Sequence, residues 1–387
     1  MSFWQAFSAC WRKILSDHGL IPLFVLAIPF YAFFYPLPYD TEAVRGIRVL
    51  VVDQDASPLS RQLIRELSAA PSVRLEGVMS DLEAARREMA DGRVAGLVVV
   101  PYGFFRDVQR GTPTTVEAWG TGAFPVQSKA VLEAAGGVVQ GIARQAATVR
   151  MVRQGASTAY ARQGAAQPPA YIEQNLFNIT RGYGSYVVAA VAILIVHQVI
   201  LIGIATLIGT WYEDRCAPLF AEGPVGNAFA GVWSALALAA FPGFLFMMGC
   251  VFWFQDYPRG GNLWGAVGFA GLMSLAVAAM GLFAGALFGK RERALQALLV
   301  TSMPTLFVSG VMYPREAMPG LLQAIAATIP STPGINAFLK LNQMGAAWSE
   351  IRPEIWNMSL LVLLYGLTAW LMLVWRRRRL QAKSDLP

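Results

Sequence analysis

The chain has 387 residues, of which 55% are hydrophobic and 14% are charged, and its mean hydropathy is +0.46. Soluble domains carry about 25% charged residues, so this composition excludes an ordinary soluble protein and indicates an integral membrane protein surrounded by membrane lipid. The net charge of +7 does not indicate a nucleic-acid partner, because the basic residues cluster beside apolar segments, where they orient a protein in the bilayer. The polar region 40–180 contains no cysteine and therefore no disulfide framework.

The first segment, residues 1–39, combines an amphipathic stretch with an apolar one. Two interpretations of the amphipathic stretch stay open: a helix lying on the membrane surface, or an extension of the first span. Leu20–Leu37 is apolar throughout and is expected to be a retained first span, bent at Pro22 and Pro29, with the N-terminus in the cytoplasm. The apolar residues that recur at helical spacing before it are Phe3, Trp4, Phe7, Trp11, Ile14 and Leu15.

Residues 40–180 have the pattern of a soluble α/β domain placed between the first and second spans. Helices are expected at Ser57–Ala69 and Asp81–Ala90, followed by one long helical tract over about 125–163. The apolar stripe of that tract, from Val131 to Val152, has near-heptad spacing, and it either packs on its own sheet or pairs with a second subunit. Strands are expected at Ile47–Val52, Val73–Val78, Gly96–Val100 and Thr114–Trp119.

Residues 181–380 are expected to supply five further membrane helices, which makes six in a membrane α-helical fold. Basic residues flank the ends that six alternating crossings assign to the cytoplasm, notably Lys290 and the run Arg376–Arg379. Both termini, including a tail at 381–387, are therefore predicted to be cytoplasmic, and the α/β domain to lie outside. The expected spans are 186–208, 229–254, 263–288, 294–311 and 355–375.

The stretch Leu298–Leu341 is predicted to form a re-entrant element near 313–341. Its prolines leave only Leu321–Ile329 free to form a short helix, against the roughly 20 residues that a span needs. Broken backbone at membrane depth is tolerated where protein covers it or where it lines a cavity, so we expect a gate or pathway lining here. The residues assigned to this gate are Ser309, Gly310, Pro314, Pro319, Pro330 and Pro333.

Two further groups of residues are candidates for function. His197 and Gln198 lie near the middle of the second span, where a polar side chain either hydrogen-bonds between helices or contacts a substrate. The connection Trp211–Pro224 is the longest predicted cytoplasmic loop. Two interpretations stay open for it: a docking site for a partner, or an ordinary solvated loop. Glycines from Gly265 to Gly285 allow close approach of helices, for packing or for dimerisation.

Enzyme motifs are weak or missing. Asp53 and Asp55 follow a predicted strand, as in phosphotransfer enzymes that hold magnesium on paired aspartates. Such enzymes also need a downstream lysine and more acids near the metal, but Lys129 is the only lysine of the domain and the domain has no histidine, so a turn is favoured. The segment Gly285–Arg291 approaches a phosphate-binding loop but has the wrong spacing and no hydroxyl residue after its lysine. The chain is thus expected not to be an enzyme, and to bind no cofactor and no metal itself.

Taken together, the residues resemble the permease subunits of type-2 ABC exporters, and among these the drug-efflux-like permeases with a large extracytoplasmic insert. The resemblance covers nearly the whole chain. The matching segments are Ser309-Gly310-x-x-x-Pro314, Met318-Pro319, Pro330-x-Thr332-Pro333, Leu341-Asn342-Gln343-Met344-Gly345-Ala346, Val52-Asp53-Gln54-Asp55, and Gly92 ahead of Gly96–Pro101.

The resemblance implies a multi-pass protein of the bacterial inner membrane that exports a hydrophobic or amphipathic compound. It implies two permeases per transporter, as a homodimer or with a related chain, and a separate ABC ATPase subunit that binds ATP and Mg. Such permeases often work with a periplasmic adaptor and an outer-membrane channel. One departure is that Arg215-Cys216 replaces the usual Gly-Thr of the docking loop. The implied ATPase-docking residues are Trp11, Arg12, Glu213, Asp214 and Arg215.

The alternative function is a membrane-anchored sensor whose outer domain binds a ligand or partner. A membrane-bound hydrolase is disfavoured, because the outer domain lacks a nucleophile and base constellation. The re-entrant element distinguishes the first two, since a sensor needs anchors but no gate. An ATPase gene beside this one would be the most informative external observation.

Overall fold

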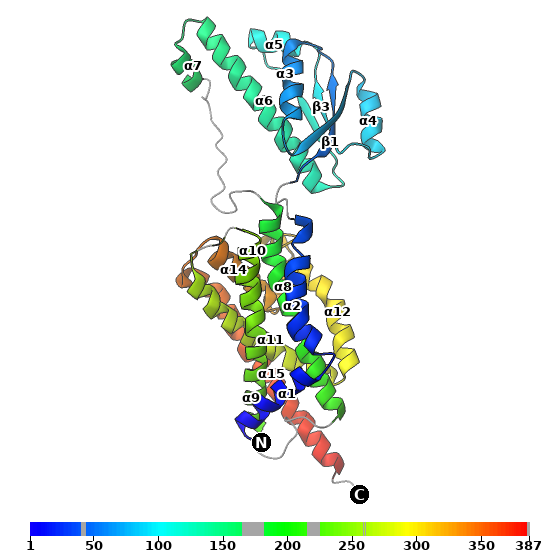
Figure 1. The fold of residues 1–387 in the computed structure, drawn as a ribbon, viewed down its shortest axis with the longest axis vertical. Helices are drawn as coiled ribbons and strands as arrows, with labels where there is room; N and C mark the ends of the chain where they lie inside the picture. The colour runs from blue at the N-terminus through cyan, green and yellow to red at the C-terminus, as the bar shows by residue number, and fades with distance from the viewer. Residues whose placement is uncertain (40–43, 165–181, 215–224, 258, 260, 385–387) are drawn as a thin grey trace. The chain divides into compact units, whose positions relative to one another are not determined.

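The structure is a computed structural model that describes residues 1–39, 44–164, 182–214, 225–257, 259 and 261–384. It divides into two compact units, which we call the helical unit and the α/β unit. The helical unit combines Met1–Glu42 with Leu176–Pro387, and the α/β unit is Ala43–Asn175 (Figure 1).

The helical unit begins with α1 (Phe3–Ser16), followed by the π-helical turn η1 (Pro22–Leu26) and α2 (Ala27–Phe34). Ser2 caps α1, since its hydroxyl accepts a hydrogen bond from the Gln5 backbone N–H. The later elements are η2 (Leu37–Tyr39), α8 (Tyr183–Asp214), α9 (Val225–Leu245), η4 (Phe246–Val251), α10 (Phe252–Phe254), α11 (Leu263–Phe288), α12 (Arg291–Val308), η5 (Arg315–Ala317), α13 (Gly320–Ala327), α14 (Ser331–Phe338), η6 (Leu339–Gln343), η7 (Trp348–Ile351) and α15 (Arg352–Ser384). Because α15 continues to Ser384, the tail expected from residue 381 begins inside a helix.

Five helical segments of the described chain are long and apolar enough to span a membrane, one fewer than expected. The expected span that is absent from these five, 294–311, corresponds to α12, which is 18 residues long and starts with the charged residues Arg291, Glu292 and Arg293. Its apolar part, from Ala294 to Val308, is shorter than the roughly 20 residues of a typical span. The five segments are Pro22–Tyr39, Gly184–Asp214, Val225–Phe254, Leu263–Phe288 and Trp348–Arg378.

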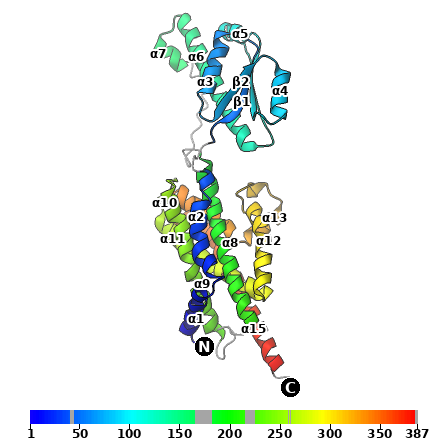
Figure 2. The ribbon, with the colours of Figure 1, turned by 45° about the vertical axis from the view of Figure 1, so that its right-hand side comes forward.

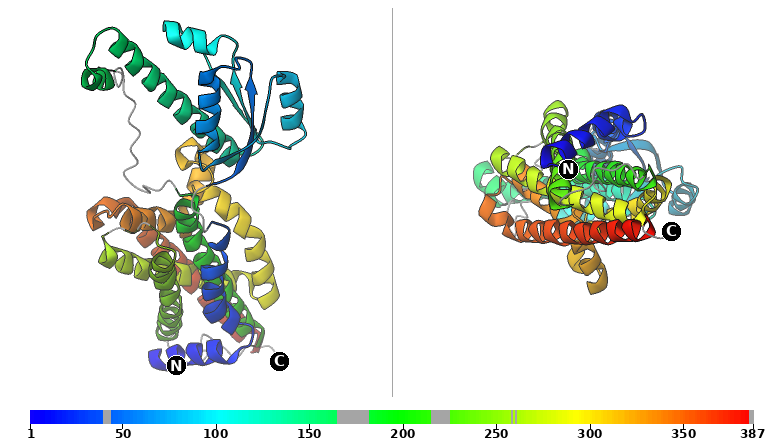
Figure 3. Two further views of the ribbon diagram at one scale, coloured as in Figure 1. Left: turned by 45° about the horizontal axis from the view of Figure 1, so that its top comes forward. Right: turned by 90° about the horizontal axis from the view of Figure 1, so that it is seen from below.

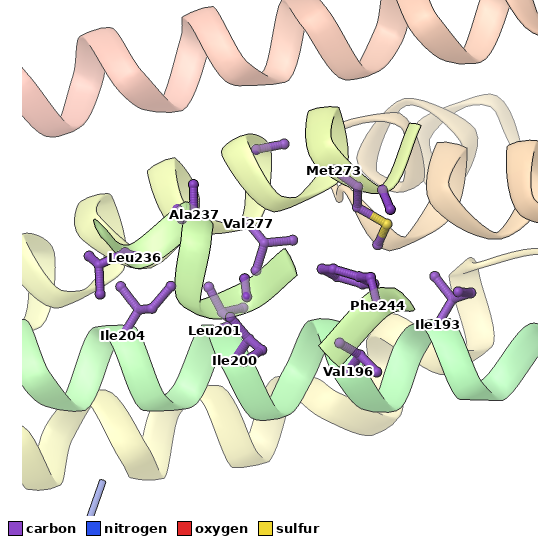
Figure 4. Close-up of a cluster of buried hydrophobic side chains, with 14 of the residues drawn as sticks. Ile193, Val196, Ile200, Leu201, Ile204, Leu236, Ala237, Phe244, Met273 and Val277 are labelled. Carbon is purple, nitrogen blue, oxygen red and sulfur yellow. The ribbon is translucent and has the colours of Figure 1, made fainter. Parts of the chain in front are cut away.

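Helix α8 is the centre of the helical unit, with most of its side chains buried against α9, α11, α12 and α14. Figure 4 shows the α8 side chains, including Ile193, Ile200 and Leu201, packed against Phe244 of α9 and Met273 of α11. Small residues allow this close packing: a Cβ atom on Gly285 of α11 would lie 2.5 Å from the Ile208 Cβ of α8. Figure 3 shows α1 and α15 on opposite sides of the unit, with α8 and α11 between them.

The α/β unit contains a four-stranded sheet in the order β2-β1-β3-β4. β1 pairs in parallel with β2 and β3, while β4 pairs antiparallel with β3, so Val49 lies opposite Gly96 and Leu97 opposite Trp119. The elements are β1 (Ile47–Asp53), α3 (Pro58–Ser68), β2 (Val73–Met79), α4 (Leu82–Ala90), β3 (Gly96–Val100), α5 (Phe104–Arg110), β4 (Glu117–Gly120), α6 (Pro125–Arg153) and α7 (Thr158–Gly164).

The sheet has a hydrophobic core on each face, as expected of an α/β unit. Alternate residues of β1 point to opposite faces: Val49 and Val51 pack with α3 and α6, while Leu50 and Val52 pack with α4. This alternation follows from the two-residue repeat of a strand. Figure 2 shows the helices α3 and α4 on the two sides of the strands.

The structure differs from the predictions for this unit in three places. The last strand starts at Glu117 rather than at residue 114, and α5, which was not predicted, follows β3. The long tract is two helices, α6 and α7, because Gly155 adopts a φ of +93° after α6 has ended. The apolar stripe of α6 packs on its own sheet at Val131, Ala135 and Ile142, but Val149 and Val152 near its end are exposed.

Candidate functional site

The stretch predicted to be re-entrant forms a hairpin of two short helices, α13 and α14, at one end of the helical unit (Figure 1). We predicted only one helix here, over Leu321–Ile329. The second forms because Pro330 is the N-cap residue of α14 and Pro333 lies in its first turn, where no backbone donor is needed. Proline therefore starts α14 rather than preventing it.

The other predicted gate residues fix the turns of this hairpin. Ser309 is the C-cap residue of α12, and its hydroxyl donates a hydrogen bond of 2.7 Å to the Leu306 carbonyl. Gly310 follows with a φ of +92°, a conformation that favours glycine. Pro314 and Pro319 are the N-cap residues of η5 and α13. All six gate residues thus belong to one continuous element.

The two helices of the hairpin differ in burial. Every residue of α14 except Asn336 is buried, whereas α13 exposes Leu321 by 74% and buries only Ala326. The Tyr365 hydroxyl of α15 donates a hydrogen bond of 2.8 Å to the Thr328 carbonyl at the end of α13. Helix α14 is therefore the part of the hairpin that enters the bundle.

Four hydrogen bonds anchor the segments around the hairpin. The Gln343 amide donates to the Ser185 carbonyl of α8 at 2.7 Å, and the Tyr186 hydroxyl of α8 donates to the Val311 carbonyl at 2.7 Å. Lys340 of η6 donates to the buried carboxylate of Glu354 in α15 at 2.7 Å. The fourth runs from the Asn262 amide to the Ala346 carbonyl, at 2.6 Å. Sequence reasoning missed the Lys340–Glu354 pair, although a lysine in an apolar stretch was a visible signal.

Polar groups at membrane depth need protein partners because lipid offers none. His197 and Gln198 of α8 are 1% and 8% exposed. Both ring nitrogens of His197 and the amide oxygen of Gln198 lack a hydrogen-bond partner in the part of the chain that the structure describes. The structure thus gives no support to interhelical hydrogen bonding by these atoms, the more ordinary of their two predicted roles.

The predicted ATPase-docking residues lie at the opposite end of the helical unit. Trp11 lines an apolar groove between α1, η1, α2 and α9, whereas Arg12 is exposed. Glu213 and Asp214 are exposed at the end of α8, and the Glu213 carboxylate accepts a hydrogen bond of 3.3 Å from the Arg291 backbone N–H. Arg215 lies outside the described residues.

Arg291 joins these elements, which the sequence did not reveal. Its guanidinium lies 3.3 Å from the carboxylate of Asp17, the C-cap residue of α1. Partial burial raises the pKa of Asp17, but the hydrogen bond from the Gly19 backbone and the charge of Arg291 outweigh this effect, so its pKa lies below the ordinary value. The start of α12 is thus tied to the ends of both α1 and α8.

The paired aspartates of the α/β unit have structural roles. The Asp53 carboxylate accepts hydrogen bonds from the backbone of Asp55 and Ala56 and from the Ser60 hydroxyl. The Asp55 carboxylate accepts from Gly103 and Phe105 at the start of α5. Among the described residues, no group of three histidine, cysteine or acidic side chains could hold a metal ion. The turn interpretation of this motif therefore agrees with its geometry.

A family model described as ABC-2 family transporter protein matches residues 19–371. The chain belongs to the ABC-2 transporter family. No match was found among curated proteins.

Membership of the ABC-2 family indicates the general role of the chain. Together with the five apolar helices, it makes the chain a multi-pass membrane protein and points to the membrane subunit of an ABC transporter. The family implies an ATPase partner, and its members are transport subunits that are generally not catalytic themselves. The segment Gly285–Arg291 forms the end of α11 and the start of α12, whereas a phosphate-binding loop joins a strand to a helix.

Proposed function

We propose that this chain is the permease subunit of an ATP-driven exporter, which moves an amphipathic compound out of the cytoplasm or the inner leaflet. The observation that carries the proposal is helix α14, a short proline-started helix buried inside the bundle. A membrane-anchored sensor would need spans but no broken helix among them. In a transporter, broken helices of this kind mark the pathway.

The proposal includes six membrane crossings, with α12 as the fifth. Gly209, near one end of α8, packs on the backbone of Lys290 and Arg291, and Tyr186, near the other end, bonds to Val311 just after α12. From 186 to 209, α8 rises about 35 Å at 1.5 Å per residue, which exceeds the roughly 30 Å of the hydrocarbon core. Since α12 accompanies α8 over this distance, it supports a crossing despite its short apolar part.

Six crossings place both termini in the cytoplasm, the α/β unit outside, and the hairpin at the outer end of the pathway. Cysteines introduced at Ser128 and Ala221 should then react with an impermeant thiol reagent from opposite sides of the membrane, because the first belongs to the α/β unit and the second to the predicted cytoplasmic loop. Labelling of both from one side would contradict this topology.

The proposal assigns docking of the ATPase to α1 and the end of α8, with ATP and Mg bound by that partner. Arg12, Glu213 and Asp214 are exposed there, and Arg291 connects this surface to α12. Movement of the docked ATPase would therefore reach α12, and the hairpin that follows it, through the Asp17–Arg291 pair. The second permease subunit, and an adaptor with an outer-membrane channel, complete the proposed assembly.

The gate is tested by replacing both Pro330 and Pro333 with alanine. Proline costs about 3 kcal/mol inside a helix, so its removal should allow α13 and α14 to merge. We expect export to be lost while the complex assembles and ATP hydrolysis becomes partly uncoupled. The control is Pro353→Ala in the first turn of α15, which should leave export unchanged. Normal export by the assembled double variant would refute the gate.

A further inference from the structure

Among the described residues of the helical unit, the buried polar side chains without a protein hydrogen-bond partner include one histidine of α8 and two hydroxyl residues of α14. His197 of α8 is 1% exposed, and Ser331 and Thr332 of α14 are 0% exposed. Both ring nitrogens of His197 and both hydroxyl oxygens are without a partner in the described chain. A buried polar group without a partner carries its full desolvation penalty, so native structures rarely keep such groups without a use.

The packing of α14 on α8 places the three side chains at one depth. Gly334 of α14 packs against Ile193 of α8, since a Cβ atom at Gly334 would lie 3.5 Å from the Ile193 Cγ2. Gln343, which follows α14, bonds to Ser185 at the outer end of α8, whereas Gly334 packs against Ile193 further along α8. The two helices therefore run antiparallel. His197 lies about 6 Å deeper than Ile193, and Ser331 about 4.5 Å deeper than Gly334, at a rise of 1.5 Å per residue.

This depth is near the middle of the membrane crossing. His197 is about 20 Å along α8 from Gly184, where the span begins. Lipid cannot satisfy polar groups at that level, and in membrane proteins such groups face the interior of a bundle or a wet cavity. At that depth, the water or substrate of a wet pathway could satisfy them.

We infer that His197, Ser331 and Thr332 form a hydrogen-bonding lining of the translocation pathway, which α14 and α8 cover here and expose when they separate. This inference rests on the proposed exporter function. The Tyr365 hydrogen bond ties the deep end of the hairpin to α15, and no hydrogen bond found among the described residues ties it to α8. At its deep end, α14 can therefore separate from α8 without breaking a hydrogen bond found among the described residues, while the Gln343 and Tyr186 bonds hold the outer end.

The lining also defines the class of substrate. An imidazole and two hydroxyls offer donors and acceptors, and Lys340 and Glu354, which follow α14 in the chain, pair with each other. Such a lining suits an amphipathic compound with uncharged hydroxyl or amide groups. It gives no counter-ion to a strongly charged compound.

The test measures whether water reaches this level during transport. In a variant without the native cysteines, Ser331→Cys and Thr332→Cys are compared with Ala337→Cys, an equally buried control on α14. The complex with its ATPase is reconstituted in nanodiscs and treated with a small charged methanethiosulfonate. We expect the first two variants to react at least tenfold faster during ATP turnover than without nucleotide, and the control to stay unreactive.

Two outcomes would overturn the inference. Cysteines at both positions that stay unreactive in every nucleotide state would show that the level is never wet. Equal reactivity with and without ATP would show a permanent water pocket that plays no part in gating. If ATP hydrolysis in the same preparation depends on the permease, either outcome refutes only the proposed lining. If the rate of hydrolysis is the same with and without the permease, the exporter function itself is refuted.

A second variant separates a pathway role from a structural one. Thr332→Val keeps the side-chain shape and removes the hydroxyl. If the hydroxyl has no partner in the covered state, the variant should melt at a higher temperature while its export of a hydroxyl-bearing substrate falls. A lower melting temperature would show that Thr332 makes a stabilising hydrogen bond, and this would contradict the inference.

Discussion

Asp55 offers the sharpest test of the α/β unit, because replacing it with alanine separates a structural role from a metal-binding one. Its carboxylate accepts hydrogen bonds of 2.9 Å from the Gly103 backbone N–H and 3.0 Å from that of Phe105. It thereby holds the start of α5 against the end of β1. Asp55→Ala removes both bonds at once and adds no bulk.

The magnitude follows from the number and exposure of these bonds. Loss of a helix cap costs about 0.5–2 kcal/mol, and a hydrogen bond to a charged group contributes about 1.5–3 kcal/mol. Phe105 is partly exposed, at 37%, so water satisfies its freed N–H in the variant. We therefore expect the local opening free energy of α5 to fall by about 2 kcal/mol, which is about a 30-fold change in the opening equilibrium.

Hydrogen–deuterium exchange of the full chain measures this opening directly. The peptide that covers α5 should exchange about 30-fold faster in Asp55→Ala. The control is Asp91→Ala, whose exposed carboxylate pairs with Arg93 at 2.7 Å on the surface, and it should change exchange little. A change of less than about threefold in α5, or protection of α5 by added Mg²⁺ in the wild type, would refute the structural role.

Three further predictions concern the helical unit. Lys340→Met leaves the Glu354 carboxylate buried without its partner. Because the lysine side chain is 38% exposed, we expect the free energy of unfolding to fall by about 2 kcal/mol, less than the roughly 3–5 kcal/mol for a fully buried pair. The double variant with Glu354→Leu should recover most of the lost melting temperature. Gly285→Val should destabilise the unit by about 1–3 kcal/mol in thermal unfolding, since even its Cβ would lie 2.5 Å from the facing isoleucine of α8. The lowered pKa of Asp17 stabilises the fold above the unfolded value of 3.8 and ceases to do so as pH falls through the folded pKa. The difference in melting temperature between wild type and Asp17→Asn should therefore be constant at neutral pH and shrink below about pH 4; a constant difference at all pH values would contradict the pairing of Asp17 with Arg291.

Sequence periodicity determined most of the local structure. The strands at 47, 73 and 96 begin at the predicted residues, and five apolar segments of the predicted six are long enough to span a membrane. These features depend on contiguous residues, because a two-residue or 3.6-residue repeat is visible without knowledge of the fold. The predicted turn at Asp53 and Asp55 belongs to the same class, since side chains hydrogen-bond to backbone nearby in the chain.

The errors arose where distant contacts decide the outcome. We expected proline to end helices, but Pro330 and Pro333 stand at the start of α14. Burial of Gly334 and Phe338 between other helices stabilises this helix, which is too short to be stable alone. The exposed end of α6 at Val149 likewise depends on where its sheet ends. Local propensity cannot show either feature.

The candidate sites divide in the same way. The sequence by itself indicated a membrane protein and predicted a proline-broken segment near 313–341, because apolar length and proline spacing are local properties. Only the tertiary structure brought Arg291 to Asp17, across most of the chain, and placed Ser331 at the depth of His197. The reason is that ion pairs and shared depth depend on which helices lie side by side, and helix packing is decided by the fit of small and large side chains between elements far apart in sequence.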